Sequence, residues 1–107
     1  MVRNTNEEII KFLKTFKKNV NQVFKVEKII LFGSRARNDH LLSSDVDLIL
    51  ISKDFKKLEF RKRAPLILDY WKGDVDLEVL CYTPEEFKRK SKQLGIVKQA
   101  IKEGIEF

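Results

Sequence analysis

The fold of this chain is decided by residues 29–51, which read IILFGSRARNDHLLSSDVDLILI. The apolar run that ends at Gly33 predicts a strand over Val26–Phe32. Val46–Ile51 predicts a second strand, apolar on both faces except at Asp47. The polar segment between them, residues 33–44, carries glycine, serine and two arginines, so two buried strands are joined by a segment suited to ligand contact.

Helices are expected around these strands. The capping-box spacing of Thr5 and Glu8 predicts a helix that ends near Phe24. Its expected apolar stripe is Ile9, Leu13, Phe16, Val20 and Val23. The other expected elements are a helix over 58–71 kinked or split by Pro65, a strand over 75–82, a helix capped by Thr83, and a helix over 96–103 ended by Gly104. Three short strands with helices between them predict an α/β (α+β) sandwich.

Length and composition bound the class of protein. A chain of 107 residues fits one domain, residues 1–107, without room for a separate acceptor-binding module. No apolar run approaches the roughly 18 residues of a membrane span, and no signal peptide is visible. The lone Cys81 excludes an internal disulfide, so we expect a cytoplasmic protein. A net charge of +6 is compatible with polyphosphates, nucleic acid or an acidic partner, without choosing among them.

Two carboxylates stand together at the start of the second strand. Asp45 and Asp47 are two residues apart and therefore point to the same face. Burying two like charges side by side is unfavourable, and a divalent cation such as Mg²⁺ or Mn²⁺ would compensate. The third strand adds Asp76 between two apolar residues, with Glu78 as the alternative third carboxylate on the same face. Three carboxylates on adjacent strands could hold two metal ions roughly 3.5–4 Å apart.

A phosphate-binding segment is expected directly after the first strand, in Gly33-Ser34-Arg35-Ala36-Arg37. Glycine lets the backbone approach a ligand, and Ser34 offers a hydroxyl and an amide. Arg35 and Arg37 add positive charge beside them. Arg35 and His40 are separated by four residues. Because both lie in a polar loop, we interpret this Arg–His spacing as coincidental and not as a catalytic motif.

The pair Gly33-Ser34, a gap of ten residues, and then Asp45-Val46-Asp47-Leu48 resembles the signature of the DNA polymerase β-like nucleotidyltransferase superfamily. The flanking residues are similar to the minimal nucleotidyltransferase (MNT) branch, although Asn38 replaces a glycine that many members have. The resemblance implies a nucleotidyltransferase fold, a short mixed β-sheet packed by helices. It also implies that Gly33 and Ser34 bind phosphate and that Asp45, Asp47 and Asp76 bind metal.

The function expected from this resemblance is metal-dependent transfer of a nucleoside monophosphate, AMP from ATP, to a hydroxyl on a partner protein. That partner would be a helical HEPN-type protein, and the chain would act as an antitoxin. The alternative is a non-catalytic module that neutralises the same partner by contact. Nucleic-acid binding is suggested only by charge, and no motif supports it. The acceptor, the base preference and the oligomeric state, homo- or hetero-oligomer, are left open by the sequence.

Overall fold

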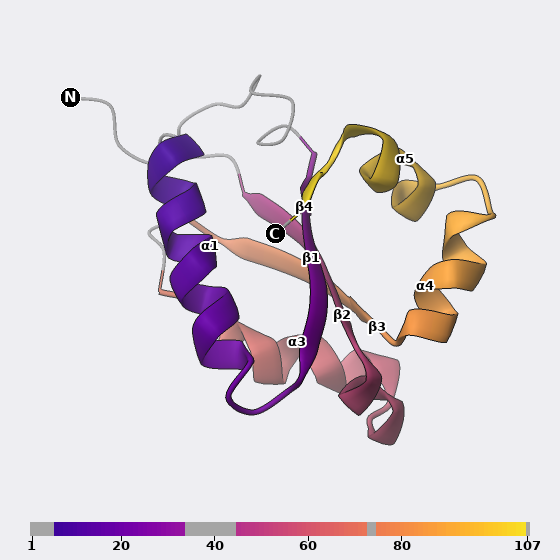
Figure 1. The fold of residues 1–107 in the computed structure, drawn as a ribbon, viewed down its shortest axis with the longest axis horizontal. Coiled ribbons are helices and arrows are strands. Elements are labelled where there is room, and N and C mark those ends of the chain that lie inside the picture. Colours follow the sequence, from indigo (N-terminus) through magenta and orange to yellow (C-terminus); the bar gives the residue numbers. More distant parts are fainter. Residues whose placement is uncertain (1–5, 34–44, 73–74, 107) are drawn as a thin grey trace.

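The computed structural model describes residues 6–33, 45–72 and 75–106 of the chain. A four-stranded mixed sheet in the order β3-β2-β1-β4 forms its centre (Figure 1). The elements are α1 (Asn6–Val20), β1 (Val26–Phe32), β2 (Val46–Ser52), the 3₁₀-helix η1 (Lys53–Lys57), α3 (Phe60–Leu68), β3 (Leu77–Tyr82), α4 (Pro84–Ser91), α5 (Ile96–Glu103) and β4 (Ile105–Glu106). The expected α/β class with a short mixed sheet packed by helices is confirmed.

β2 is an inner strand of this sheet. It pairs antiparallel with β1 and parallel with β3, while β1 pairs antiparallel with β4 on its other side. Every residue of β2 is buried except Asp47, which is half-buried. An inner strand covered on both faces reads as a continuous apolar run, which is why Asp47 stands out within it.

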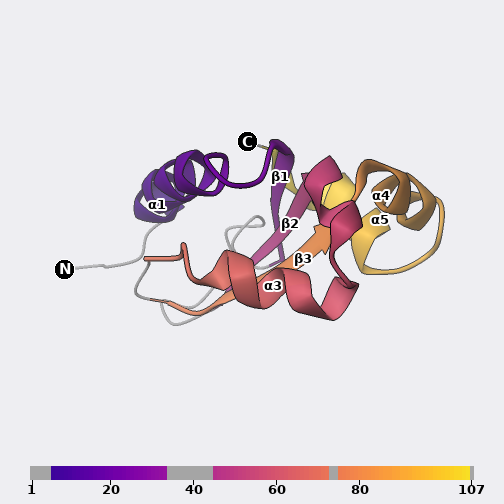
Figure 2. The same cartoon turned by 90° about the horizontal axis from the view of Figure 1, so that it is seen from below.

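Helices cover both faces of the sheet. One face packs against α1 and α3, through a core that includes Leu13, Phe16 and Ile67. The other face packs against α4 and α5, where Val97 and Ala100 belong to a second, smaller core. Figure 1 shows α1 and the α4–α5 pair on opposite sides of the strands, and Figure 2 shows α3 running along the sheet.

The N-terminal helix is shorter than expected. It ends at Val20, and a hydrogen-bonded turn in which the Phe24 amide donates to the Val20 carbonyl leads on to β1. The expected buried stripe holds through Val20, but Val23 is 58% exposed because the turn carries it off the helix. Thr5, the expected cap, lies outside the described residues.

Pro65 does not split its helix, which was one of the two expected outcomes. It lies within the single helix α3, on the exposed side, where water can satisfy the carbonyl that loses its amide partner. Residues 53–57, before the expected helix, form η1 instead of loop. Trp71, after α3, packs edge-on against Phe12 and Phe16 of α1, and its indole donates to the Val75 carbonyl at 2.7 Å.

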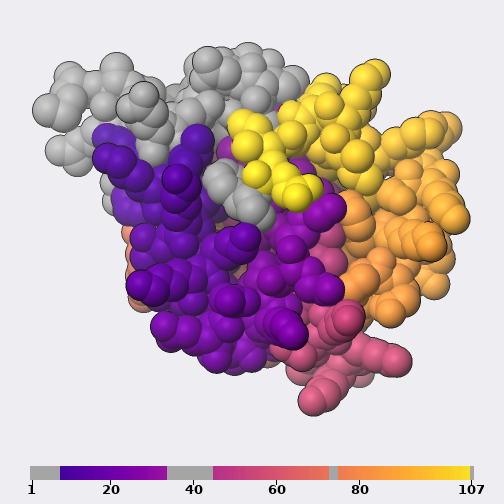
Figure 3. Space-filling view, viewed as in Figure 1, coloured from indigo at the N-terminus to yellow at the C-terminus, as the bar shows by residue number. Residues whose placement is uncertain are grey.

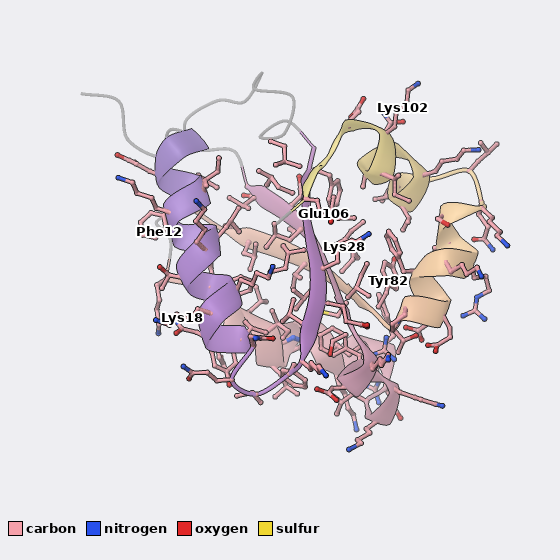
Figure 4. All side chains as sticks on the ribbon, viewed as in Figure 1. Phe12, Lys18, Lys28, Tyr82, Lys102 and Glu106 are labelled. Atoms are coloured by element: carbon pink, nitrogen blue, oxygen red, sulfur yellow. The ribbon has the colours of Figure 1, made fainter. Side chains whose placement is uncertain are left out.

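In the C-terminal half, the start of one helix agrees with the prediction, and one strand was not predicted. Thr83 caps α4 in a full capping box with Glu86, as predicted. The two-residue strand β4 was not expected; it pairs with β1, and Lys28 forms an ion pair with Glu106 at 3.3 Å (Figure 4). Figure 3 shows α4 in orange and α5 in yellow forming one flank of the molecule. Within the described residues, no helix is both long and apolar enough to span a bilayer.

Candidate active site

The side chains of Asp47 and Glu78 share the sheet face that α4 and α5 cover. On β2, Ile49 and Ile51 belong to the core of that face, and alternation along the strand places Asp47 with them. On β3, Tyr82 belongs to the same core and sets the face of Glu78 in the same way. The parallel register aligns Asp47 with Glu78, so the two carboxyl groups meet across neighbouring strands.

The carboxyl groups of Asp47 and Glu78 are placed so that one can donate a hydrogen bond to the other when it carries a proton. Burial, this hydrogen bond, the charge of Glu78 and the charge of Asp45 together raise the pKa of Asp47 to about 6. Such crowding of acidic groups disfavours full ionisation unless a cation is present. The site therefore has the electrostatic character that favours a bound cation.

Gly33 holds the chain against Asp47. Its φ of 77° lies in the left-handed region, which glycine adopts without steric cost. A Cβ at this position would lie 2.5 Å from the Oδ2 atom of Asp47. The close approach of backbone and carboxylate thus requires glycine for two independent reasons.

We expect Gly33→Ala to destabilise the protein through backbone strain and through a steric clash with Asp47. The left-handed backbone should cost about 1–2 kcal/mol, and the collision with Asp47 about 1–3 kcal/mol more. Urea unfolding of Gly33→Ala in the wild-type and Asp47→Ala backgrounds separates the two terms. In the second background only the backbone strain should remain, and an equal loss in both backgrounds would contradict the contact.

The two other predicted metal ligands flank this pair. Asp45 is exposed just before β2, and its charge acts on Asp47. Asp76 is exposed just before β3, which begins two residues later than expected, and its backbone carbonyl accepts a hydrogen bond from the Val46 amide at 2.8 Å. The contact partner of Asp47 on the neighbouring strand is therefore Glu78, and the choice between Asp76 and Glu78 as third carboxylate stays open.

The donor set is compatible with magnesium. Across residues 6–33, 45–72 and 75–106, no three His, Cys, Asp or Glu side chains are grouped closely enough to hold a metal by themselves. Mg²⁺ does not need such a cage, because it is commonly bound by one or two carboxylates together with substrate phosphates and water. The crowded Asp47–Glu78 pair fits that mode. Ser34, Arg35 and Arg37, the other predicted phosphate contacts, lie outside the described residues.

Two hollows lie next to helix α5. One, of about 430 Å³, lies between the end of β1 and helix α5 and includes Gly33 in its wall. The other, of about 500 Å³, lies between β3 and the α4–α5 pair and includes Leu80 and Tyr82. Gly95 and Ile96 border both hollows. Neither hollow could be predicted from the sequence, because the hydrophobic pattern does not indicate which face of the sheet α5 covers.

The known proteins that this chain resembles are nucleotidyltransferases by name. The family "Nucleotidyltransferase domain" matches residues 9–106. Two curated proteins of Methanocaldococcus jannaschii are similar over shorter segments: "Putative protein adenylyltransferase MJ0141", 38% identical over 52% of this chain and 59% of that protein, and "Putative protein adenylyltransferase MJ0126", 39% identical over 43% and 47%. The matched segments thus span about half the length of these relatives.

A solved structure resembles the whole fold. It is the crystal structure of a "putative nucleotidyltransferase" from Sulfolobus solfataricus. The TM-score is 0.69 at 26% sequence identity, and the alignment covers 96% of this chain and 82% of the other. The arrangement of sheet and helices around Asp47 is therefore found in a second protein of the same kind.

Proposed function

Because the chain belongs to the nucleotidyltransferase domain family, we propose that it transfers AMP from ATP to a hydroxyl group of a partner protein. The observation that carries this proposal is the acidic pair Asp47–Glu78, placed beside the glycine turn at Gly33. The names of the two curated relatives support protein adenylylation in particular.

The residues of the site have distinct roles in this proposal. Gly33, with Ser34 and Arg35, contacts the triphosphate through the backbone, a hydroxyl and a positive charge. Arg37 adds further positive charge. Asp45 and Asp47 would hold Mg²⁺ or Mn²⁺, which when bound offsets phosphate charge and lowers the pKa of the acceptor hydroxyl.

The transfer itself needs little covalent chemistry from the chain. The acceptor oxygen forms a bond to the α-phosphorus, the bond from that phosphorus to the pyrophosphate oxygen breaks, and pyrophosphate leaves with the bonding electrons. A carboxylate on the β3 side, Asp76 or Glu78, receives the proton of the acceptor hydroxyl. The contribution of the chain is then positioning and electrostatic stabilisation.

The acceptor should come from a second protein, for which we propose a helical HEPN-type partner, with the chain acting as an antitoxin. The hollow beside β3 supports a partner surface, since Leu94 is 90% exposed and Ile96 61% exposed at its border. Arg89 and Lys90 add positive charge to the same border, which favours an acidic partner segment. The same exposed surface also supports the second candidate, a module that neutralises the partner by contact without turnover.

A direct test is to incubate the purified protein with Mg²⁺, ATP labelled at the α-phosphate and a HEPN-type partner. Labelled AMP on the partner, with release of pyrophosphate, supports the enzyme. A stable complex without label, under Mg²⁺ or Mn²⁺ and with each of the four NTPs, would favour the binding module.

Nucleotide binding should also be visible as stabilisation. Mg²⁺ with NTP relieves the crowding of acidic groups around Asp47 and binds the native state alone. A ligand at a hundredfold excess over its Kd adds about 2.7 kcal/mol of stability, which corresponds to roughly 10 °C in Tm for a domain of this size. Thermal unfolding with Mg²⁺ alone, NTP alone and both together measures the effect. An unchanged Tm at saturating Mg²⁺ with every NTP would count against nucleotide binding.

A further inference from the structure

The hollow beside Gly33 is bounded on two sides by different parts of the fold. Phe32 and Gly33 form the wall from β1, and α5 contributes Ile96, Gln99 and Glu103. Phe32 pairs with Asp47 across the β1–β2 ladder, so the hollow begins next to the carboxylates. Its volume of about 430 Å³ lies within the range of small-molecule sites. A nucleotide whose triphosphate lies at Gly33 can therefore place its nucleoside here.

The walls of this hollow suit a flat ring. Phe32 is half-buried and belongs to the edge of the second core, so its ring is held in place. Ile96, across from β1 on α5, is 61% exposed and offers an apolar surface. An aromatic ring and an aliphatic side chain are the surfaces on which a nucleobase packs.

Gln99 supplies the polar edge of the hollow. Its Nε2 atom donates a hydrogen bond to Oε1 of Glu103, one helical turn away, at 2.6 Å. That bond sets which end of the amide is oxygen and which is nitrogen, because a carboxylate accepts only from the NH₂ group. Among the described residues, the side-chain oxygen of Gln99 and its second N–H form no other hydrogen bond, so one acceptor and one donor remain for a ligand.

We propose that this hollow is the subsite for the adenine base of the donor nucleotide and that Gln99 reads the edge of that base. Adenine presents an amino group beside a ring nitrogen, which is the pattern an amide pairs with in two hydrogen bonds. The Glu103 carboxylate beside Gln99 makes this end of the hollow rich in acceptors, so the keto oxygens of guanine and uracil are disfavoured there. Cytosine shares the amino pattern but has a smaller ring to pack against Phe32. The assignment rests on the proposed function, since it places the triphosphate at Gly33.

The test is binding, measured by calorimetry with Mg²⁺ and each of ATP, CTP, GTP and UTP. The wild type should bind ATP most tightly, CTP next, and GTP and UTP weakly. Gln99→Met keeps a good helix former and a similar length but removes both polar groups, so ATP affinity should fall about ten- to a hundredfold while UTP affinity changes little. Gln99→Glu keeps the shape, loses the N–H donor and places a second negative charge beside Glu103, so it should also weaken ATP binding.

Gln93→Met is the matched control, because Gln93 is an exposed glutamine that borders the other hollow. It should leave all four affinities unchanged. Equal affinities for the four NTPs in the wild type, or an ATP preference that survives in Gln99→Met, would overturn the adenine subsite and leave the proposed function standing. A wild type that binds none of the four would overturn both.

Discussion

Asp47→Asn should lower the rate of AMP transfer by about a thousandfold while leaving the fold at least as stable as that of the wild type. Asparagine is nearly isosteric with aspartate, but it lacks the negative charge that a divalent cation requires. Stability should not fall, because the change removes a charge from beside Glu78 and Asp45 and keeps a donor for the hydrogen bond to Glu78. Loss of activity without loss of stability is the signature of a functional residue held in an unfavourable setting.

The measurement combines α-labelled ATP transfer to the partner with thermal unfolding of the same preparations. Asp69→Asn is the control, since Asp69 is an exposed aspartate at the end of α3, away from β2. It should leave both quantities unchanged. An Asp47→Asn variant that transfers AMP at the wild-type rate would remove Asp47 from the metal site and with it the proposed mechanism.

The identity of the third carboxylate can be decided in the same assay. Asp76→Asn and Glu78→Gln each remove one candidate charge from the β3 side. The carboxylate that takes the acceptor proton should show the larger loss of transfer, with ATP binding by calorimetry retained. The Glu78 side chain interacts with Asp47, whereas Asp76 lies opposite Asp45, one residue before the first pair of the β2–β3 register.

Local signals in the sequence predicted local structure well. The bounds of β1 and the capping box at Thr83 were confirmed, because an apolar run ended by glycine and a Thr-Pro-Glu-Glu segment each determine a conformation within a few residues. The fold class followed from the order of such elements. In the structure, the pairing of β1 with β2 brings Gly33 next to Asp47.

Features that depend on distant residues were missed. Which residue of β3 faces Asp47 depends on the register of two parallel strands, and no sequence pattern states that register. β4 has two residues and exists only because β1 offers an edge to pair with. Arg63 lies among lysines and arginines in a stretch that reads as a solvated helix face, yet it is 4% exposed.

Arg63→Ala should destabilise the protein by about 3–5 kcal/mol, the usual cost of removing one partner of a buried ion pair. The guanidinium joins three segments: it donates to the Leu58 carbonyl at 3.0 Å, to the Cys81 carbonyl at 3.0 Å and to Oε1 of Glu86 at 2.6 Å. Its truncation removes one donor from each of the two carbonyls and from the Glu86 carboxylate, which keeps its hydrogen bond from the Thr83 amide. Arg63→Lys should recover only part of the loss, because an ammonium cannot reproduce the planar fork of donors.

Arg61→Ala is the matched control two residues away on the same helix. Arg61 forms an ion pair with Glu59 at 3.1 Å, but its side chain is 80% exposed, so its removal should change stability by less than about 0.5 kcal/mol. Urea unfolding of both variants against the wild type measures the difference. Equal and small losses would show that the Arg63 contacts do not hold α3, β3 and α4 together.

The acid dependence of stability gives a second measure of the same pair. Burial pushes the pKa of Glu86 upward, but hydrogen bonds from Arg63 and Thr83 and the charge of Arg63 outweigh it and hold the pKa below its usual value. A carboxyl whose pKa is lower in the folded state stabilises the protein fully above its unfolded pKa, and that stabilisation is lost as the pH falls through the folded pKa. Wild-type stability should therefore decline as the pH falls from the usual pKa of a glutamate through the lowered pKa of Glu86. The decline should be shallower in Arg63→Ala, because the main cause of the lowered Glu86 pKa is gone. Parallel pH profiles for the two proteins, measured as urea midpoints, would show that Arg63 does not set the charge state of Glu86.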